Sequence, residues 1–394
     1  MVEPHLADAL KIRNHMLDDM FSVRKIKVEE KKTSGEDIEE SVAADELIDS
    51  DGRHIVEKVG VFCDDSSQFV LNVMAHRGLD PQSCDVHCGF DGGQGMLKLA
   101  VTITDRQESE QSGRSLYSQG VAAKQAKNSS VKKLFLLGVV PDVPETHYNV
   151  QTILSNLNLS AIEFTTAADL KMYMLLTGKS LGKPKFGCPF CSACTPYLED
   201  GELYYLKDLL ALHKAYSEAG GIKRTQQKYQ NVTNPPLLTA DDSKLIIEVL
   251  CIPELHILIG VVDKLLKEFE KNVFPSEDLG LKFMDKYLKK VAIERKSYQG
   301  AHSLEGNQSR DFLKKVDILQ QALEKESEAA VLNGLPFIHT FRAFSKVVSS
   351  CFGVSLQEDY QAQIFEFKRL YLALGISVTP KVIKLSTRFF TGIC

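Results

Sequence analysis

Apolar residues repeat with two different periods in the first half of the chain. Residues 66–77 carry large apolar side chains at helical spacing, which predicts an amphipathic helix. The period then becomes two. Residues 86–90 predict a short strand and residues 96–103 (MLKLAVTI) a second one, and the glycine-rich stretch 91–95 (DGGQG) predicts the turn between them. These positions therefore predict a pair of adjacent antiparallel strands.

Two further strands and two helices follow. Residues 133–140 (KLFLLGVV) form a continuously apolar run, as in a strand covered on both faces. Residues 145–157 predict a helix, 161–165 a fourth strand, and 168–176 a second helix. The expected order is strand, strand, strand, helix, strand, helix.

The rest of the chain is predominantly helical in pattern. Residues 377–385 could return to a strand. We expect a charged N-terminal region over 1–60, a mixed α/β core over 61–178, a helical part over 179–374 and a short end over 375–394. The expected helices cover residues 201–219, 241–248, 253–270, 279–294, 309–333 and 360–374.

Composition narrows the class of protein. The 394 residues are 44% apolar and carry a net charge of −5, so the chain as a whole does not have the basic character of a nucleic-acid binder. Residues 27–52 are rich in charge and predict an exposed linker or a solvated helix. The start resembles no secretory signal, and no apolar run is long enough to span a membrane. We expect an intracellular protein, nuclear or cytoplasmic, with reduced thiols and no membrane partner.

Two aspartates are the first candidates for chemistry. Asp91 ends the first expected strand and Asp169 follows the fourth. In a sheet with this strand order, the first and fourth strands lie side by side, so the two carboxylates would face each other. A pair of Mg²⁺ or Mn²⁺ ions would neutralise them and could clamp a phosphodiester. Two simpler roles are open: Asp91 can belong to an ordinary turn, and Asp169 can cap the next helix.

Three cysteines within seven residues are the second candidate. Cys188 and Cys191 have the two-residue spacing of a zinc half-site, and Cys194 repeats it. A structural zinc site needs four ligands, so we expect His256 as a distant ligand, with Cys194 or His213 completing the set. A redox C-x-x-C pair and simple packing of small residues remain alternatives.

Four lysines follow Asp169 closely. They could contact a phosphate backbone beside a catalytic metal, although a solvated loop is the slightly preferred explanation. These lysines are Lys171, Lys179, Lys183 and Lys185.

Five dispersed blocks of sequence carry a resemblance to a known family. They include CGFDGGQGMLKLAVTI, the D-x-K segment that runs into C-x-x-C, and LGISVTPKV, and they span 88–103, 164–191, 252–266, 298–314 and 374–382. Together they resemble RNase H-like DDE transposases that carry a C-x-x-C zinc-binding insertion. The resemblance implies an α/β fold with an RNase H-like mixed sheet core (β-β-β-α-β-α) and a large all-α insertion. It also implies that Asp91 and Asp169 are the first two catalytic carboxylates, with DNA as the substrate.

The family's third carboxylate is a glutamate on a helix beyond the T-P-K-V block. Here that block is Thr379–Val382, and no acidic residue follows it; Glu358 and Glu366 precede it. We therefore expect a truncated, inactive relative of a DNA strand-transfer enzyme, unless a residue such as Glu254 substitutes.

A second hypothesis belongs to another class. The chain could be a non-enzymatic, domesticated helical protein that uses zinc and apolar helices to bind a partner. The first hypothesis requires Mg²⁺ or Mn²⁺ at Asp91 and Asp169, whereas the second requires only Zn²⁺ at the cysteines. A C-x-x-C oxidoreductase would instead require an exposed thiol of low pKa.

Overall fold

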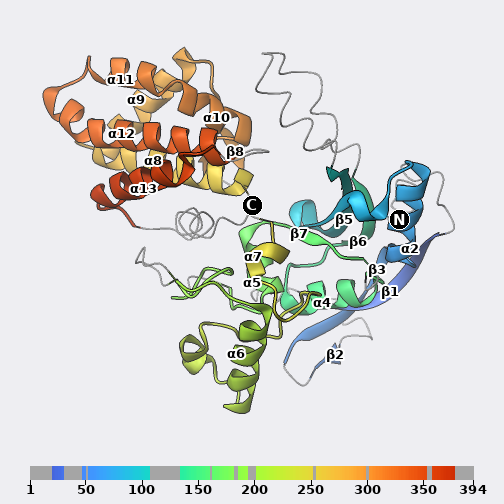
Figure 1. The fold of residues 1–394 in the computed structure, drawn as a ribbon. Helices are drawn as coiled ribbons and strands as arrows, with labels where there is room; N and C mark the ends of the chain where they lie inside the picture. The colour runs from blue at the N-terminus through green and yellow to red at the C-terminus, as the bar shows by residue number, and fades with distance from the viewer. Residues whose placement is uncertain are drawn as a thin grey trace, which may run out of the picture. The chain divides into compact units, whose positions relative to one another are not determined.

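The chain divides into two units, one built on a sheet and one mainly helical in its described residues. The first contains Met1–Pro184 and Tyr204–Cys251, and the second contains Lys185–Leu203 and Ile252–Cys394. Figure 1 shows the ribbon of the computed structural model. It describes residues 20–30, 47–49, 52–106, 134–159, 162–181, 185–193, 201–251, 254–298, 301–352 and 357–377.

A mixed sheet is the centre of the first unit. Its strands run in the order β1-β3-β6-β5-β4-β7, with β2 paired to β3. They are β1 (Phe21–Glu29), β2 (Leu47–Ile48), β3 (His54–Cys63), β4 (Cys84–Asp91), β5 (Met96–Asp105), β6 (Phe135–Pro141) and β7 (Thr165–Ala167).

The pairing of β4 determines where the candidate aspartates lie. β4 is antiparallel to β5 through eight residue pairs, and β5 is antiparallel to β6. On its other side β4 pairs with β7 in parallel, with His87 opposite Thr165 and Gly89 opposite Ala167. The expected adjacency of the first and fourth strands is therefore confirmed, although the fourth strand lies at Thr165–Ala167 and not at 161–165.

Helices of the first unit begin at side-chain caps that the sequence supplies. Asp65, Thr146 and Asp169 each accept a hydrogen bond from a backbone N–H in the first turn of the helix that follows. These helices are α2 (Ser66–His76), α4 (His147–Ser155) and α5 (Leu170–Leu176), close to the expected ranges. The unit also contains α6 (Leu206–Glu218), α7 (Ile246–Val249) and the short 3₁₀ turns η2 (Pro81–Ser83), η3 (Gly93–Gly95) and η5 (Lys223–Tyr229).

Side chains alternate between the two faces of β4. Cys84, Val86, Cys88 and Phe90 are buried on one face. The other face carries Asp85, His87, Gly89 and Asp91, which are partly or fully exposed. The candidate aspartate thus shares its face of the strand with a histidine and a glycine.

Three strands of this sheet, β1, β2 and β3, were not expected. β1 pairs with β3 through nine residue pairs, β2 pairs with β3, and β3 pairs with β6. All three lie wholly or mostly within residues 1–60, where a charged N-terminal region was expected. The sheet therefore continues past the expected core on the side away from β7.

In the residues that the structure describes, the second unit is mainly helical and includes one short hairpin. Five phenylalanines with at most 1% exposure are part of its core: Phe269, Phe312, Phe341, Phe344 and Phe367. The helices are α8 (Glu254–Asn272), α9 (Glu277–Lys290), α10 (Gly306–Lys314), α11 (Val316–Leu323), α12 (Glu328–Cys351) and α13 (Tyr360–Ala373), and the hairpin is β8 (Lys296–Tyr298) with β9 (Ala301–Ser303).

The structure differs from the sequence-based expectation in one helix boundary and in the unit to which one segment belongs. The single helix expected over 309–333 is instead three helices, α10, α11 and the start of α12, with breaks at Lys315 and at residues 324–327. Segment 204–251, expected within the helical part, belongs to the unit that contains the sheet. The expected strand over 377–385 lies almost entirely outside the described residues. Among the helices of the described chain, none has the length and apolarity needed to cross a membrane.

Candidate functional site

Asp91 is the last residue of β4 and projects from the end of the sheet. Its side chain is 67% exposed, and Lys98 of the neighbouring strand places its Nζ 3.4 Å from Oδ2. The backbone N–H of Gly93 donates to Oδ1 at 3.0 Å. Asp91 therefore also has the turn-forming role that its D-G-G context allows.

Asp169 lies two residues beyond the last pair of the β4–β7 ladder. Since Gly89 is opposite Ala167, the same register carried two residues further leads from Asp91 to Asp169. The Asp169 carboxylate accepts a hydrogen bond from the Met172 N–H at 2.8 Å and caps α5. The two aspartates thus belong to the same end of two hydrogen-bonded parallel strands.

Glu145 is a third carboxylate at this end of the sheet, which the sequence analysis did not single out. A Cβ built on Gly92 would lie 1.9 Å from Oε1 of Glu145, so the glutamate side chain passes directly over this glycine. Glu145 is also ion-paired with Lys171, two residues after Asp169. In the sequence, the one sign that another side chain lies close to this turn is the glycine at position 92. That glycine does not show that the side chain belongs to Glu145.

Lysines neutralise two of these carboxylates. Lys98 pairs with Asp91, and Lys171 pairs with Glu145, whose side chain is only 16% exposed. Asp169 is engaged as a helix cap instead. Hard carboxylate oxygens are the donors that Mg²⁺ or Mn²⁺ prefers, but these three carboxylates are not gathered closely enough in the described residues to form a metal-holding group. An ion at this end of the sheet would also compete with two ammonium groups and one helix cap.

Small residues form the middle of the sheet face that leads away from Asp91. Gly89 lies between Ala100 of β5 and Ala167 of β7, and a Cβ at Gly89 would meet only two backbone oxygens, at 3.8 and 3.9 Å. The next pair on the same face of the sheet is His87 with Thr165. This face therefore has polar groups at both ends and little steric bulk between them.

The expected zinc ligands are only partly within the described residues. Cys188 and Cys191 are both 0% exposed, and Cys194 lies outside the described residues. His256 is exposed near the start of α8. Within the part of the chain that the structure describes, no three His, Cys, Asp or Glu side chains are grouped so as to hold a metal ion. The zinc site stays a prediction.

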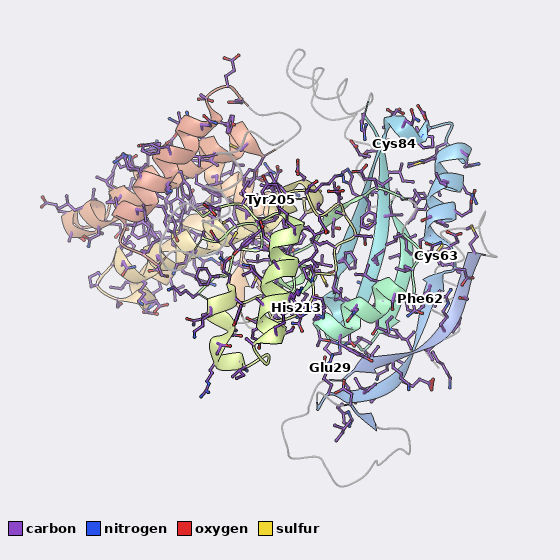
Figure 2. All side chains as sticks on the ribbon, turned by 60° about the horizontal axis from the view of Figure 1, so that its bottom comes forward. Glu29, Phe62, Cys63, Cys84, Tyr205 and His213 are labelled. Atoms are coloured by element: carbon purple, nitrogen blue, oxygen red, sulfur yellow. The ribbon has the colours of Figure 1, made fainter. Side chains whose placement is uncertain are left out.

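His213, the alternative ligand, lies on α6 of the first unit (Figure 2). Its Nδ1 is buried and has no hydrogen-bond partner among the residues that the structure describes. Burial lowers the pKa of this imidazole, so the neutral form is favoured.

The four lysines differ in their availability to DNA. Lys179 is 1% exposed, and its Nζ is 3.2 Å from the hydroxyl of Tyr204 and 4.5 Å from the ring centroid. The ammonium group of Lys179 is therefore buried and is not presented at the surface, and a contact between Lys179 and a phosphate backbone stays an untested prediction. Lys171 and Lys185 are exposed, and Lys183 lies outside the described residues.

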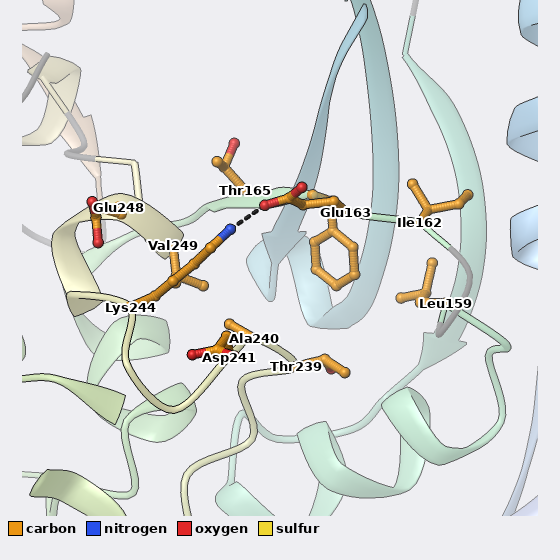
Figure 3. A pocket seen from close by; sticks show the side chains of 11 residues that line it. Leu159, Ile162, Glu163, Thr165, Thr239, Ala240, Asp241, Lys244, Glu248 and Val249 are labelled. Carbon is orange, nitrogen blue, oxygen red and sulfur yellow. Dashed lines mark hydrogen bonds and ion pairs between the residues drawn. The ribbon is translucent and has the colours of Figure 1, made fainter. Parts of the chain in front are cut away.

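A cavity of about 380 Å³ lies in the first unit beside the start of β7 (Figure 3). Its walls combine apolar side chains such as Leu159 and Val249 with the hydroxyl-bearing Thr165. Lys244 and Glu163 form an ion pair along the wall. No pattern in the sequence indicates this cavity, because its walls come from segments 159–165 and 239–249, which are distant in the chain.

Comparison with the models of known protein families and with the curated proteins finds no match for this chain.

Proposed function

We propose that the first unit derives from an RNase H-like DNA transposase and that Asp91 and Asp169 are the remains of its metal-binding centre. The parallel pairing of β4 with β7 is the observation that carries this proposal. It brings two aspartates, separated by more than seventy residues in the sequence, to one end of one sheet. The strand order β6-β5-β4-β7, with the first three strands antiparallel, agrees with such a core.

A carboxylate pair at this position suits phosphodiester chemistry. Asp91 and Asp169 would hold Mg²⁺ or Mn²⁺, which supplies charge neutralisation at a scissile phosphate. Glu145 adds a nearby acceptor group, since its carboxylate lies over Gly92. The protein itself would contribute the position of these oxygens, because catalysis of this kind depends mainly on positioning and electrostatics.

We further propose that the centre is catalytically inactive. Asp91 is paired with Lys98, Glu145 is paired with Lys171, and Asp169 caps α5. A divalent ion would therefore displace two ion pairs and weaken a helix cap. We expect weak metal binding and no efficient strand cleavage. DNA binding is expected to be weak as well, given the net charge of −5 and the burial of Lys179.

Metal binding and DNA cleavage test the proposal together. The purified chain is titrated with Mn²⁺, followed by electron paramagnetic resonance of the free ion, and is incubated with labelled duplex DNA. Asp91→Ala is compared with Asp85→Ala, because Asp85 lies on the same face of the same strand and pairs with Arg106. We expect weak Mn²⁺ binding that only Asp91→Ala abolishes, and no cleavage by any of the proteins.

The experiment distinguishes an error about the location of the metal site from an error about its lack of activity. Efficient cleavage lost in Asp91→Ala would show that the site is correct and the inactivity wrong. Mn²⁺ binding that is unaffected by Asp91→Ala would contradict the metal centre itself.

A zinc-stabilised interaction protein is the second candidate. Two cysteines at zinc-ligand spacing, both fully buried, favour it. Metal analysis of the dialysed protein should then find about one zinc per chain, and Cys188→Ser should remove it. A chain without zinc would leave packing as the role of these thiols.

A further inference from the structure

A cysteine, a threonine and a histidine from three distant segments meet on the sheet face that also carries Asp91. The Cys251 Sγ lies 3.3 Å from the Thr165 Oγ1, and that oxygen lies 2.6 Å from the His87 Nδ1. Sγ and Nδ1 are themselves 4.0 Å apart. The hydroxyl therefore lies within hydrogen-bonding distance of both the thiol and the imidazole.

One assignment of protons accounts for the hydrogen bonds that run through the Thr165 hydroxyl and the His87 ring. The Cys251 thiol donates to Thr165, and the Thr165 hydroxyl donates to Nδ1 of His87. The proton of the ring is then on Nε2, which donates to the Thr104 Oγ1 at 3.4 Å. The Thr104 hydroxyl in turn donates to the Asp85 carbonyl at 3.3 Å. The imidazole is thus neutral, with Nδ1 oriented to receive a proton from the thiol side.

The backbone fixes the position of Cys251. Its N–H donates to the carbonyl of Thr166 at 2.7 Å, which extends the sheet at β7. Its carbonyl accepts a hydrogen bond from the hydroxyl of the fully buried Tyr173. The thiol is therefore held beside Thr165 by groups on both sides of its own residue.

Other cysteines of the first unit lack this setting. Cys63 and Cys88 are 0% exposed, and burial raises the pKa of their thiols to about 11 and about 12. Cys251 is only half-buried. A reagent in solution can therefore reach Cys251 far more easily than Cys63 or Cys88.

We propose that Cys251 is a site of reversible thiol modification by small disulfides of the glutathione type, with Thr165 and His87 taking up its proton. The thiol proton passes to the hydroxyl oxygen of Thr165, whose own proton passes to Nδ1 of His87. The thiolate attacks one sulfur of the disulfide, so one S–S bond forms and the original S–S bond breaks. The other half of the disulfide leaves as a thiolate and takes up a proton, and no net oxidant is needed.

The size of the effect follows from ordinary thiol chemistry. A thiol with a pKa near 8.5 is about 3% ionised at pH 7, so assistance by a base can raise the reactive fraction by at most about thirtyfold. The increase in rate is smaller than this increase in thiolate, because a thiolate of lower pKa is also a weaker nucleophile. Loss of the base should therefore slow modification by about three- to tenfold.

Per-cysteine mass spectrometry of the full-length protein, incubated with glutathione disulfide at pH 7, tests this inference. Cys251 should form the mixed disulfide at least about tenfold faster than Cys88. Thr165→Val and His87→Asn should slow the reaction at Cys251 by about three- to tenfold, while Thr165→Ser should react like the wild type. Circular dichroism and thermal unfolding confirm that each variant is folded.

Two results would overturn the proposal. One is a folded wild-type protein in which Cys251 reacts no faster than Cys88. The other is a folded Thr165→Val variant that reacts at the wild-type rate. The Thr165→Val and Thr165→Ser pair keeps the test decisive even where His87→Asn fails to fold. The outcome is independent of metal binding at Asp91, so it does not depend on the proposed function.

Discussion

Replacement of Gly280 by alanine should destabilise the helical unit, although alanine is the better helix former. Gly280 lies in the first turns of α9 and faces the backbone of α8. A Cβ at this position would lie 2.0 Å from the carbonyl oxygen of Glu270 and 2.7 Å from its carbonyl carbon. The obstacle is helix backbone, which cannot rotate away as a side chain can.

The expected loss is the difference between two effects. Alanine in a helix interior gains about 1 kcal/mol over glycine. Overpacking of a close contact costs about 1–3 kcal/mol, and more where the structure cannot adjust. Only residues 273–276 connect α8 to α9, so the helices cannot easily separate here. We expect a net loss of about 2 kcal/mol, or a decrease in Tm of about 4–8 °C.

Gly306→Ala is the matched control in the same unit. A Cβ there would lie 2.2 Å from Cδ1 of Leu255, the far end of a side chain that is 52% exposed and free to change rotamer. This variant should stay within about 0.5 kcal/mol of the wild type. Urea titrations followed by circular dichroism measure both changes. A Gly280→Ala protein as stable as the wild type would refute the close crossing of α8 and α9, and equal losses in both variants would refute the role of the backbone contact.

Two other changes test buried polar groups. Tyr173→Phe should lower the free energy of unfolding by about 1–3 kcal/mol. The reason is that the Tyr173 hydroxyl hydrogen-bonds with three backbone groups, among them the N–H of Ala168 and the carbonyl of Cys251. A thermal melt unchanged from the wild type would contradict this. Burial raises the pKa of Glu270 above its ordinary value of 4.5 despite its partner Arg295, so the folded state binds this proton more tightly than the unfolded state. The wild type should therefore lose stability relative to Glu270→Gln as the pH rises from about 4.5 through the raised pKa, and a difference that grows in the opposite direction would show that the ion pair outweighs burial.

Local pattern predicted the elements that determine the candidate site. Period-two alternation located β4 and β5, an apolar run located β6, and Asp169 marked the start of α5. The expected strand order also placed the fourth strand beside β4, and the helix that connects β6 to β7 is the connection that parallel strands require. These features depend on residues close together in the sequence.

Other features depend on partners that local pattern does not specify. β1 carries several charged residues because one of its faces is open, so its composition resembles that of a linker. Two contacts of the site form only when distant segments of the chain meet. One places Glu145 over Gly92, and the other buries Lys179 against Tyr204. Charge and spacing alone could not separate the buried Lys179 from the exposed Lys171.

The short strand β7 has a consequence for the order in which the protein can fold. Thr166 completes its pairing only through Leu250 and Cys251, more than eighty residues further along the chain. Closing so long a loop carries a large entropic cost before any contact compensates for it. During synthesis, the edge of the sheet that positions Asp169 therefore cannot close until residue 251 has left the ribosome. A nascent chain arrested earlier would expose the backbone of β7 as an unpaired edge, which is a template for aggregation.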